Sequence, residues 1–371
     1  MKPFKLERYF AKYEFSAPYL LSCSDCEALS LEELLAMADE NALQMWHALK
    51  LGYTESCGHP ALREEITGLY RTIQPDDVLT IIPEEGIFIA MNNILEQGDH
   101  VVTTFPGYQS LYEIARSLGC EVSRWTPRDQ NGWTFDIRDF NALVKKNTKL
   151  IVINFPHNPT GAVLPEAAFN AVMNVARQQN MVIFSDEMYR LLEYDPGIRL
   201  TPACDLYENA VSLSGLSKSF ALAGLRTGWL ATKNTDLLRK CMFYKDYTTI
   251  CSSAPSEILA IMALRAKEEI LTRNLDLINR NLKILDTFFA RHEDLFRWPK
   301  PEAGPIGFPE LTTGMDATAF CQDLADKKGV MLLPSDVYEY GNRHFRIGFA
   351  RRNMPEALSK LEEYLKESHF Q

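Results

Sequence analysis

The stretch Ser214-Gly-Leu-Ser-Lys-Ser-Phe-Ala-Leu-Ala-Gly-Leu-Arg-Thr-Gly-Trp229 follows an apolar run that is typical of a buried strand. Lys218 comes shortly after that run, and Arg226 follows later in the same stretch, between two glycines. A lysine amine can form an imine with an aldehyde, and a planar guanidinium is a natural partner for a phosphate. The stretch therefore predicts a covalent lysine site for an aldehyde cofactor that carries a phosphate group.

Strand and helix signals alternate along the middle of the chain. Apolar runs typical of strands cover residues 100–104, 150–155, 181–184 and 210–214. Helical patterns lie between them: one helix is expected from 86 to 97, ended by Gly98, and another opens at Pro165. This alternation predicts an α/β fold with a largely parallel sheet. Ligands of such sheets bind beyond the carboxyl ends of the strands, so Asn158, Asp186 and Lys218 are expected to converge on one crevice.

The last third of the chain has a different pattern. Residues 255 to about 291 read as helical with few breaks, and a turn-rich segment follows at 299–307. A helix over 316–328, strands near Val330 and His344 and a final helix from Pro355 are typical of a small α+β domain. We expect a large domain over 45–285 and a small domain that combines 1–44 with 286–371.

Composition limits the classes of function. The chain has 371 residues, of which 46% are hydrophobic and 24% charged, and its formal net charge is −10. This balance argues against nucleic-acid and anionic-membrane partners, since both reward a basic surface. The apolar runs are strand-sized, no signal peptide is recognised, and eight scattered cysteines indicate reduced thiols, so a cytoplasmic protein is expected. Cys23-Ser-Asp-Cys26 has no matching second pair, so no metal is predicted.

Four separated motifs occur in order between Leu51 and Arg351. They are Asn158-Pro-Thr-Gly161, Asp186-Glu-Met-Tyr189, Ser217-Lys218 with Arg226, and Phe345-Arg346-Ile-Gly-Phe349. Together they resemble the fold-type I pyridoxal 5′-phosphate (PLP) enzymes of the class I/II aminotransferase family. The resemblance implies a large domain with a mostly parallel seven-stranded sheet, a small α+β domain, PLP as cofactor and a homodimer with shared active sites.

The resemblance implies a role for each residue that holds the ring of the cofactor. Lys218 would form the Schiff base and later carry a proton, Asp186 would pair with the pyridine nitrogen, and Tyr108 would stack on the ring. Asn158 and Tyr189 would hydrogen-bond the 3′ oxygen. From the residues alone, Lys218 also fits a solvated loop, Asp186 a helix cap, Asn158 a turn and Tyr108 a core position.

The same resemblance implies contacts for the phosphate and the substrate. Arg226 and Ser217 would hold the phosphate, with Tyr53 reaching it from a neighbouring subunit. Arg346 would clamp the substrate α-carboxylate, together with Asn158. By contrast, we expect surface positions for the arginines that lie near Arg346 in the sequence, which are Arg343, Arg351 and Arg352.

Two features depart from the usual pattern of that family. Gly215 stands where many relatives carry a serine or threonine whose hydroxyl binds the phosphate, and Ser217 or Ser214 is a candidate replacement. The usual glycine-rich phosphate cup reads Ile82-Pro-Glu-Glu-Gly86, so its backbone N–H groups would bind the phosphate. The cofactor contacts assigned to Glu84 and Glu85 are therefore backbone contacts, and their side chains are expected to point away.

Two enzymatic functions follow from the resemblance. The first is an aminotransferase that moves an amino group between an α-amino acid and a 2-oxo acid. The second is a lyase or cyclase, because the Pro-Glu-Glu-Gly-Ile-Phe run, the lysine loop and Ser24-Asp25 are similar to capreomycidine-synthase-like enzymes. A PLP-binding transcription regulator is disfavoured because no basic recognition helix is recognised. The substrate side chain stays open, with Asp25, Glu27 and Gly304–Gly307 as candidate pocket walls.

Overall fold

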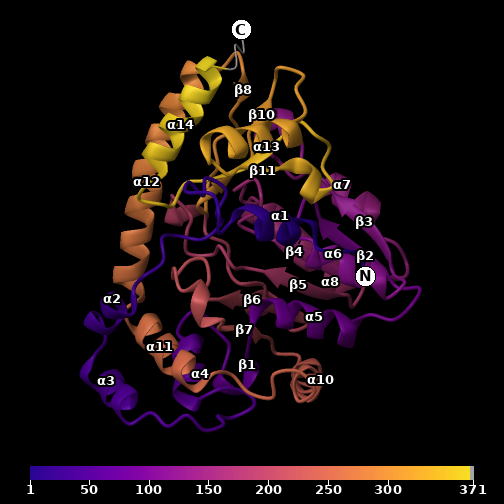
Figure 1. Cartoon of the computed structure of the whole chain (residues 1–371). Coiled ribbons are helices and arrows are strands. Elements are labelled where there is room, and N and C mark those ends of the chain that lie inside the picture. The colour runs from indigo at the N-terminus through magenta and orange to yellow at the C-terminus, as the bar shows by residue number, and fades with distance from the viewer. Residues whose placement is uncertain (368–371) are drawn as a thin grey trace.

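A seven-stranded sheet forms the centre of the molecule (Figure 1). The computed structural model describes residues 1–367 of the chain. The strand order is β1-β7-β6-β5-β4-β2-β3, and β7 runs antiparallel to both of its neighbours while the other pairs are parallel. The strands are β1 Val78–Ile81, β2 His100–Thr104, β3 Glu121–Trp125, β4 Thr148–Asn154, β5 Val182–Asp186, β6 Ala210–Gly215 and β7 Gly228–Ala231. The predicted α/β fold with a mostly parallel seven-stranded sheet is therefore confirmed.

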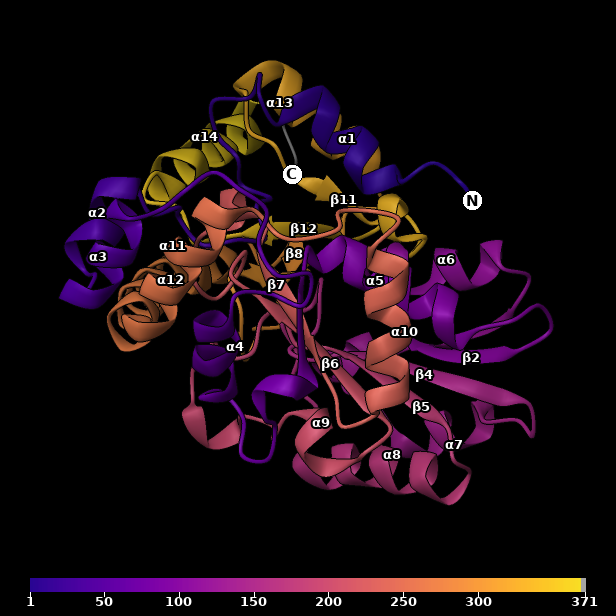
Figure 2. The ribbon, with the colours of Figure 1, turned by 90° about the horizontal axis from the view of Figure 1, so that it is seen from below.

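Helices cover both faces of this sheet, which explains why its central strands are apolar on both sides (Figure 2). One face packs against α5 Pro83–Ile94, α6 Ser110–Ser117 and α10 Thr235–Lys245. The other packs against α7 Ile137–Leu143, α8 Glu166–Gln178 and α9 Ala203–Leu206. In β4 the alternating side chains of Leu150 and Ile151 enter these two different cores.

Helix α5 differs from the sequence expectation at both ends. It begins at Pro83 rather than Gly86, because proline is well suited to the first position of a helix. It ends at Ile94, where Leu95 is already extended, and Gly98 turns the chain with a positive φ of 92°. The earlier start places Glu84 and Glu85 in the first helical turn.

The remaining helices form two further groups, one at an edge of the central sheet and one in the C-terminal third of the chain. At one edge of the sheet, a third core joins β1 and β7 to α2 Leu31–Ala36, α3 Glu40–His47, α4 Pro60–Thr67 and α11 Ala254–Arg265. The expected long helical segment is divided at Ala266, after which α12 runs from Lys267 to Arg291. Short 3-10 turns are η1 Pro75–Asp77, η2 Asp129–Asn131, η3 Pro196–Ile198, η4 Ala223–Leu225 and η5 Ser335–Tyr338.

The C-terminal third packs above the carboxyl ends of the central strands (Figure 1). Helices α12, α13 Ala317–Lys328 and α14 Met354–Glu367 share one hydrophobic core with two small sheets. These sheets have the orders β11-β12-β9 and β10-β8. Their strands are β8 Phe296–Arg297, β9 Ile306–Gly307, β10 Glu310–Leu311, β11 Leu333–Pro334 and β12 Phe345–Gly348.

The N-terminal segment is built into this C-terminal region. Helix α1 Lys5–Tyr13 packs against η5, and Tyr19 forms a parallel bridge with Val330. The N–H of Gly348 then donates to the carbonyl of Leu21, at 3.0 Å. This pairing fixes the position of the residues that follow Leu21. In residues 1–367 we find no helix with the length and apolar character that crossing a bilayer requires.

We expect Gly348→Ala to disrupt this pairing, because a Cβ there would overlap the carbonyl oxygen of Cys23. The free energy of unfolding should fall by about 3 kcal/mol, the upper end for overpacking. Denaturant or thermal unfolding measures the change. Gly52→Ala is the matched control, since a Cβ at Gly52 meets no atom within 4 Å. Equal stability of the two variants would contradict this account of the N-terminal segment.

Candidate active site

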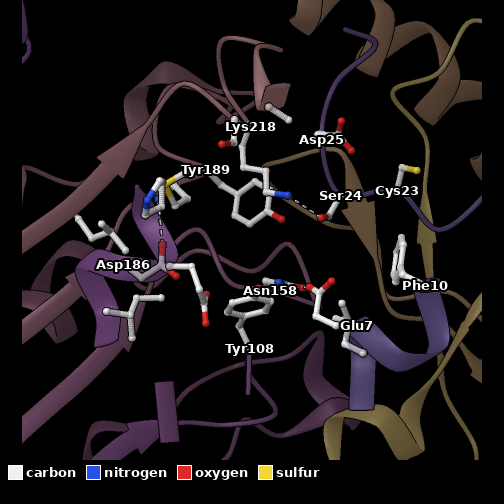
Figure 3. A pocket seen from close by; sticks show the side chains of 18 of the residues that line it. Glu7, Phe10, Cys23, Ser24, Asp25, Tyr108, Asn158, Asp186, Tyr189 and Lys218 are labelled. Carbon is white, nitrogen blue, oxygen red and sulfur yellow. Dashed lines mark hydrogen bonds between the residues drawn. The ribbon is translucent and has the colours of Figure 1, made fainter. Parts of the chain in front are cut away.

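A cavity of about 400 Å³ lies where the carboxyl ends of the central strands meet the N-terminal segment and the C-terminal region (Figure 3). It is lined by nine of the residues expected from the sequence, which are Glu84, Tyr108, Asn158, Asp186, Tyr189, Ser217, Lys218, Arg226 and Arg346. Two expected residues, Tyr53 and Glu85, do not line it. Tyr53 is 91% exposed at a separate surface hollow, so within one chain it has no contact with this cavity.

The sheet positions the central residues of the cavity. Asp186 ends β5, and Lys218 and Asn158 follow the ends of β6 and β4. The side chain of Asn154 accepts from the N–H of Asn158 at 2.8 Å and donates to the carbonyl of Asp186 at 3.1 Å. The Asn154 side chain therefore connects the loop after β4, which carries Asn158, to the end of β5, which carries Asp186.

Lys218 lies inside the cavity and points toward the N-terminal segment (Figure 3). Its Nζ donates to Oγ of Ser24 at 2.9 Å. Burial lowers the pKa of Lys218, with Arg346 and Arg226 acting in the same direction and Asp25 opposing them. A lowered pKa increases the fraction of free amine, which is the form that attacks a carbonyl.

Asp186 is a buried carboxyl group with one fixed hydrogen bond. Its Oδ1 accepts from the N–H of Met188 at 3.1 Å. Burial raises the pKa of Asp186 to about 7, although the Met188 hydrogen bond and Lys218 act against the shift. A cation placed beside this carboxyl would favour its ionised form and would in turn be stabilised by it.

Arg346 is 1% exposed and is held by neutral oxygens. Its Nε and Nη2 donate to the carbonyl of Ser22 at 3.1 and 2.8 Å. Its Nη1 donates to the hydroxyl of Tyr338 at 2.6 Å and to Oδ1 of Asn158 at 3.4 Å. Among the described residues no carboxylate pairs with Arg346, so its charge is available to an anionic ligand.

Tyr189 supplies a polar atom that protein contacts leave unsatisfied. The residue is buried, its side chain lines the cavity, and its hydroxyl has no hydrogen-bond partner in the part of the chain that is described. A buried hydroxyl without a partner is costly, so its orientation indicates a ligand. Together with the basic groups and Asp186, it fits the oxygen and nitrogen atoms of a PLP ring.

The phosphate end of the cavity differs in part from the sequence expectation. Glu85 turns away and accepts from the hydroxyls of Thr248 and Thr249. Glu84 was expected to do the same, but its side chain lines the cavity and accepts from Ser110. Successive helical residues point about 100° apart, so an early helix start turns one glutamate inward and the other outward.

The structure also explains the glycine at position 215. A Cβ there would lie 3.0 Å from Cα of Gly228 and 3.2 Å from Cγ of Pro83, so a serine or threonine does not fit without a shift. Of the two hydroxyls that were candidates to replace it, Ser217 lines the cavity and Ser214 does not. Arg226 lines the cavity rim, with a left-handed backbone and one guanidinium nitrogen bonded to the Ala223 carbonyl.

Sequence reasoning missed the wall that the N-terminal segment provides. Helix α1 contributes Leu6, Glu7 and Phe10, Glu14 follows it, and Cys23 and Ser24 join from the next loop (Figure 3). The spacing of Leu6, Phe10 and Tyr13 is a helical signal that could have revealed α1. It could not have revealed the contact of Tyr108 with this helix, where the hydroxyl of Tyr108 donates to Glu7 at 3.4 Å.

Two other expectations about charged residues need correction. The side chain of Arg351 is only 20% exposed, pairs with Asp25 at 3.0 Å and donates to the Cys26 carbonyl at 2.6 Å. It was expected to be solvated, as Arg343 and Arg352 are. Asp25 does line the cavity, but Glu27 does not, because its carboxylate turns back to accept from the N–H of Arg352.

The Gly304–Gly307 turn also lies outside the cavity lining. Gly304 packs behind the ring of Tyr189, and the end of the turn pairs with β12. The turn therefore supports a lining residue instead of forming the wall itself.

Comparisons with known proteins agree with this geometry. The family model described as aminotransferase class I and II matches residues 30–361. Capreomycidine synthase from Streptomyces vinaceus is 30% identical over 283 residues, which cover 76% of this chain and 72% of that protein.

Two solved structures are similar over almost the whole chain. A PLP-dependent aminotransferase from Streptococcus suis has a TM-score of 0.92 and 31% identity, covering 100% of this chain and 99% of its own. The PLP-dependent cyclase OrfR has a TM-score of 0.90 and 26% identity, covering 99% and 98%. The cofactor implied by these matches is pyridoxal 5′-phosphate, and the chain belongs to the class I and II aminotransferase family of PLP-dependent enzymes.

Proposed function

We propose that this enzyme is an aminotransferase that moves an amino group between an α-amino acid and a 2-oxo acid through Lys218. One observation carries the proposal: the Lys218 amine, the Asp186 carboxyl and the unpaired Arg346 guanidinium line one cavity. The bound cofactor supplies a carbonyl that condenses with amines and a ring that accepts electrons. The residues around it must bind the reactants, orient them and move one proton.

Lys218 is the proton carrier in this proposal. Lys218 would hold the cofactor covalently, and once the substrate amine had displaced it, its free Nζ would take the proton from the substrate Cα and return it during the transfer. The lowered pKa of Lys218 suits this work, because a base must be unprotonated to act. Ser24, which accepts from Nζ, is placed to hold the amine when it is not bonded to the cofactor.

Four other residues would hold the ring of the cofactor. Asp186 would pair with the pyridine nitrogen and keep it protonated, while Tyr189 and Asn158 would hydrogen-bond the 3′ oxygen. Tyr108 would stack on the ring; its own ring packs against Phe4 with centroids 5.0 Å apart, which limits its movement. These roles use the unsatisfied hydroxyl of Tyr189 and the carboxyl of Asp186 at the end of β5.

One arginine would hold the α-carboxylate of the substrate, and another would hold the phosphate of the cofactor. Arg346 binds the substrate α-carboxylate, with Asn158 beside it. The start of α5, Ser217 and Arg226 would hold the phosphate, and Tyr53 of a second copy would reach it in a homodimer. We also propose that residues 45–285 act as a large domain and that 1–44 with 286–371 act as a small one.

The charge of the N-terminal wall favours an amino donor with a cationic side chain. Asp25 is already paired with Arg351, but Glu7 and Glu14 have no ion-pair partner among the described residues. Both face the same cavity from α1 and the residue that follows it, and burial raises the pKa of Glu14. A positively charged side chain in this space would relieve their mutual repulsion.

A lyase or cyclase is the second candidate function. It is favoured by the identity with capreomycidine synthase and by the fold similarity to the cyclase OrfR. Such an enzyme would use Lys218, Asp186 and Arg346 in the same way but would need no amino acceptor. The difference therefore lies in what the enzyme does with the substrate after proton removal.

The first test separates these functions. Wild-type enzyme loaded with an amino donor should convert an added 2-oxo acid to its amino acid, with product measured by chromatography. Product formed at full rate without any oxo acid would reject amino transfer in favour of the lyase or cyclase. Lys218→Ala should abolish both the imine absorbance of bound PLP and turnover, because no other lysine among the described residues lines the cavity.

The second test concerns the donor. Glu7→Gln and Glu14→Gln should each lower kcat/KM for lysine or arginine about tenfold, the worth of one charge-assisted contact, and leave alanine as donor unchanged. Glu27→Gln is the control, because Glu27 lies outside the cavity. An equal loss for cationic and neutral donors would show that these glutamates do not select the side chain.

The third test uses the raised pKa of Asp186. Since the folded protein holds this proton up to about pH 7 and the unfolded chain releases it near pH 4, stability falls as the pH rises between these values. Cofactor-free Asp186→Asn should therefore melt several degrees above cofactor-free wild type at about pH 8, and the gap should close toward about pH 4. With PLP bound the order should reverse. If cofactor-free Asp186→Asn were instead less stable than cofactor-free wild type at about pH 8, the result would contradict the free-energy cost of ionising the buried Asp186 carboxyl.

A further inference from the structure

The phosphate end of the cavity contains a carboxyl group where an anion is expected to bind. Helix α5 spans 12 residues, and among the described residues no side chain caps its first N–H groups. The start of such a helix favours anions. Glu84, in its first turn, lines the cavity together with Pro83, Ser217 and Arg226. A bound phosphate and an ionised Glu84 would therefore compete for one positive helix end.

The groups that face Glu84 do not cancel this competition. They comprise two hydroxyls, two carboxyls and two cations, which are Ser110, Tyr108, Glu7, Asp186, Arg226 and Lys218. Burial raises the pKa of Glu84, Glu7 adds to the shift, and the hydrogen bond from Ser110 and the charge of Arg226 oppose it. A second anion at the same helix end favours the neutral carboxyl further.

We propose that Glu84 takes up a proton when the cofactor binds and donates a hydrogen bond from its carboxyl to the phosphate. The proton comes from solvent, it adds to the Glu84 carboxylate, and no other bond forms or breaks. The inference rests on the cofactor-binding role proposed for this cavity. Glu84 thereby supplies the O–H donor that position 215 does not, because a Cβ there would lie 3.0 Å from Gly228 and 3.2 Å from Pro83 and would require a shift.

Proton uptake by Glu84 would make the affinity of the enzyme for the phosphate depend on pH. Since binding takes up a proton, raising the pH opposes it, and the affinity for the phosphate falls up to tenfold per pH unit above the pKa of Glu84 in the free enzyme. A glutamine at this position has the same shape and donates at every pH. It should therefore remove the dependence without removing the contact.

Binding of pyridoxamine 5′-phosphate tests this, because that ligand has a phosphate but no aldehyde to react with Lys218. Full-length enzyme loaded with it is brought to equilibrium by dialysis at about pH 7 and about pH 9. Between these values, Kd should rise at least tenfold more for wild type than for Glu84→Gln. Glu85→Gln is the matched control: it removes the same charge one residue away, but Glu85 points to Thr248 and Thr249. It should behave as wild type.

Wild type alone provides a second measurement, which does not depend on the variant folding. Calorimetry at about pH 8 in two buffers of different ionisation enthalpy should show about one more proton taken up with pyridoxamine 5′-phosphate than with pyridoxamine. No difference in proton uptake, or the same pH profile for wild type and Glu84→Gln, would overturn the inference while leaving the cofactor site intact. No saturable binding of either ligand, with no imine from PLP, would instead reject the proposed function.

Discussion

The buried guanidinium of Arg346 holds the active-site cavity together. It joins three parts of the chain that are distant in sequence: Ser22 in the N-terminal segment, Tyr338 in η5 and Asn158 in the loop after β4. All of these contacts are to neutral oxygens, so the charge is desolvated without being neutralised. Such a group is costly to bury alone, and an anionic ligand recovers part of that cost. The interaction that assembles the cavity thus also makes it ready for a carboxylate.

Other charged groups in the cavity follow the same logic. Lys218 rests on a serine hydroxyl, Asp186 accepts one backbone N–H, and Glu84 accepts from a serine hydroxyl. Each is held in place without being neutralised by a charged partner, and each has a pKa that is shifted by burial. The Asp25–Arg351 pair is different, because its two charges satisfy each other at 3.0 Å. Shifted and unpaired groups that share a cavity are typical of a functional site, whereas a closed pair is typical of a structural one.

The sequence was sufficient for the sheet and for the residues at its strand ends. Lys218 and Asp186 were predictable because carboxyl ends of parallel strands meet at one edge. The facing of Glu84 was not, since only a helix that begins at Pro83 rather than Gly86 includes Glu84 and Glu85, and inside a helix these two adjacent side chains point about 100° apart. The wall formed by α1 was missed for another reason: its apolar spacing predicts a helix, but spacing does not specify which distant surface the helix covers. Arg351 was misjudged by the general rule that arginines are exposed.

The position of Pro83 links the two departures from the usual phosphate cup. Its ring lies against the backbone at Gly215 and Gly228, where a Cβ on either glycine would come within 3.2 Å of it. The close packing of the proline on these strands disfavours a hydroxyl-bearing side chain at 215, because a Cβ there fits only if its neighbours shift. The same proline sets the first turn of α5 and so directs Glu84 into the cavity. If Glu84 binds the phosphate as we propose, the missing hydroxyl of β6 and the carboxyl supplied by α5 would be two results of a single packing contact. Phosphate recognition would then lie on the helix instead of the strand, and it would depend on a proton.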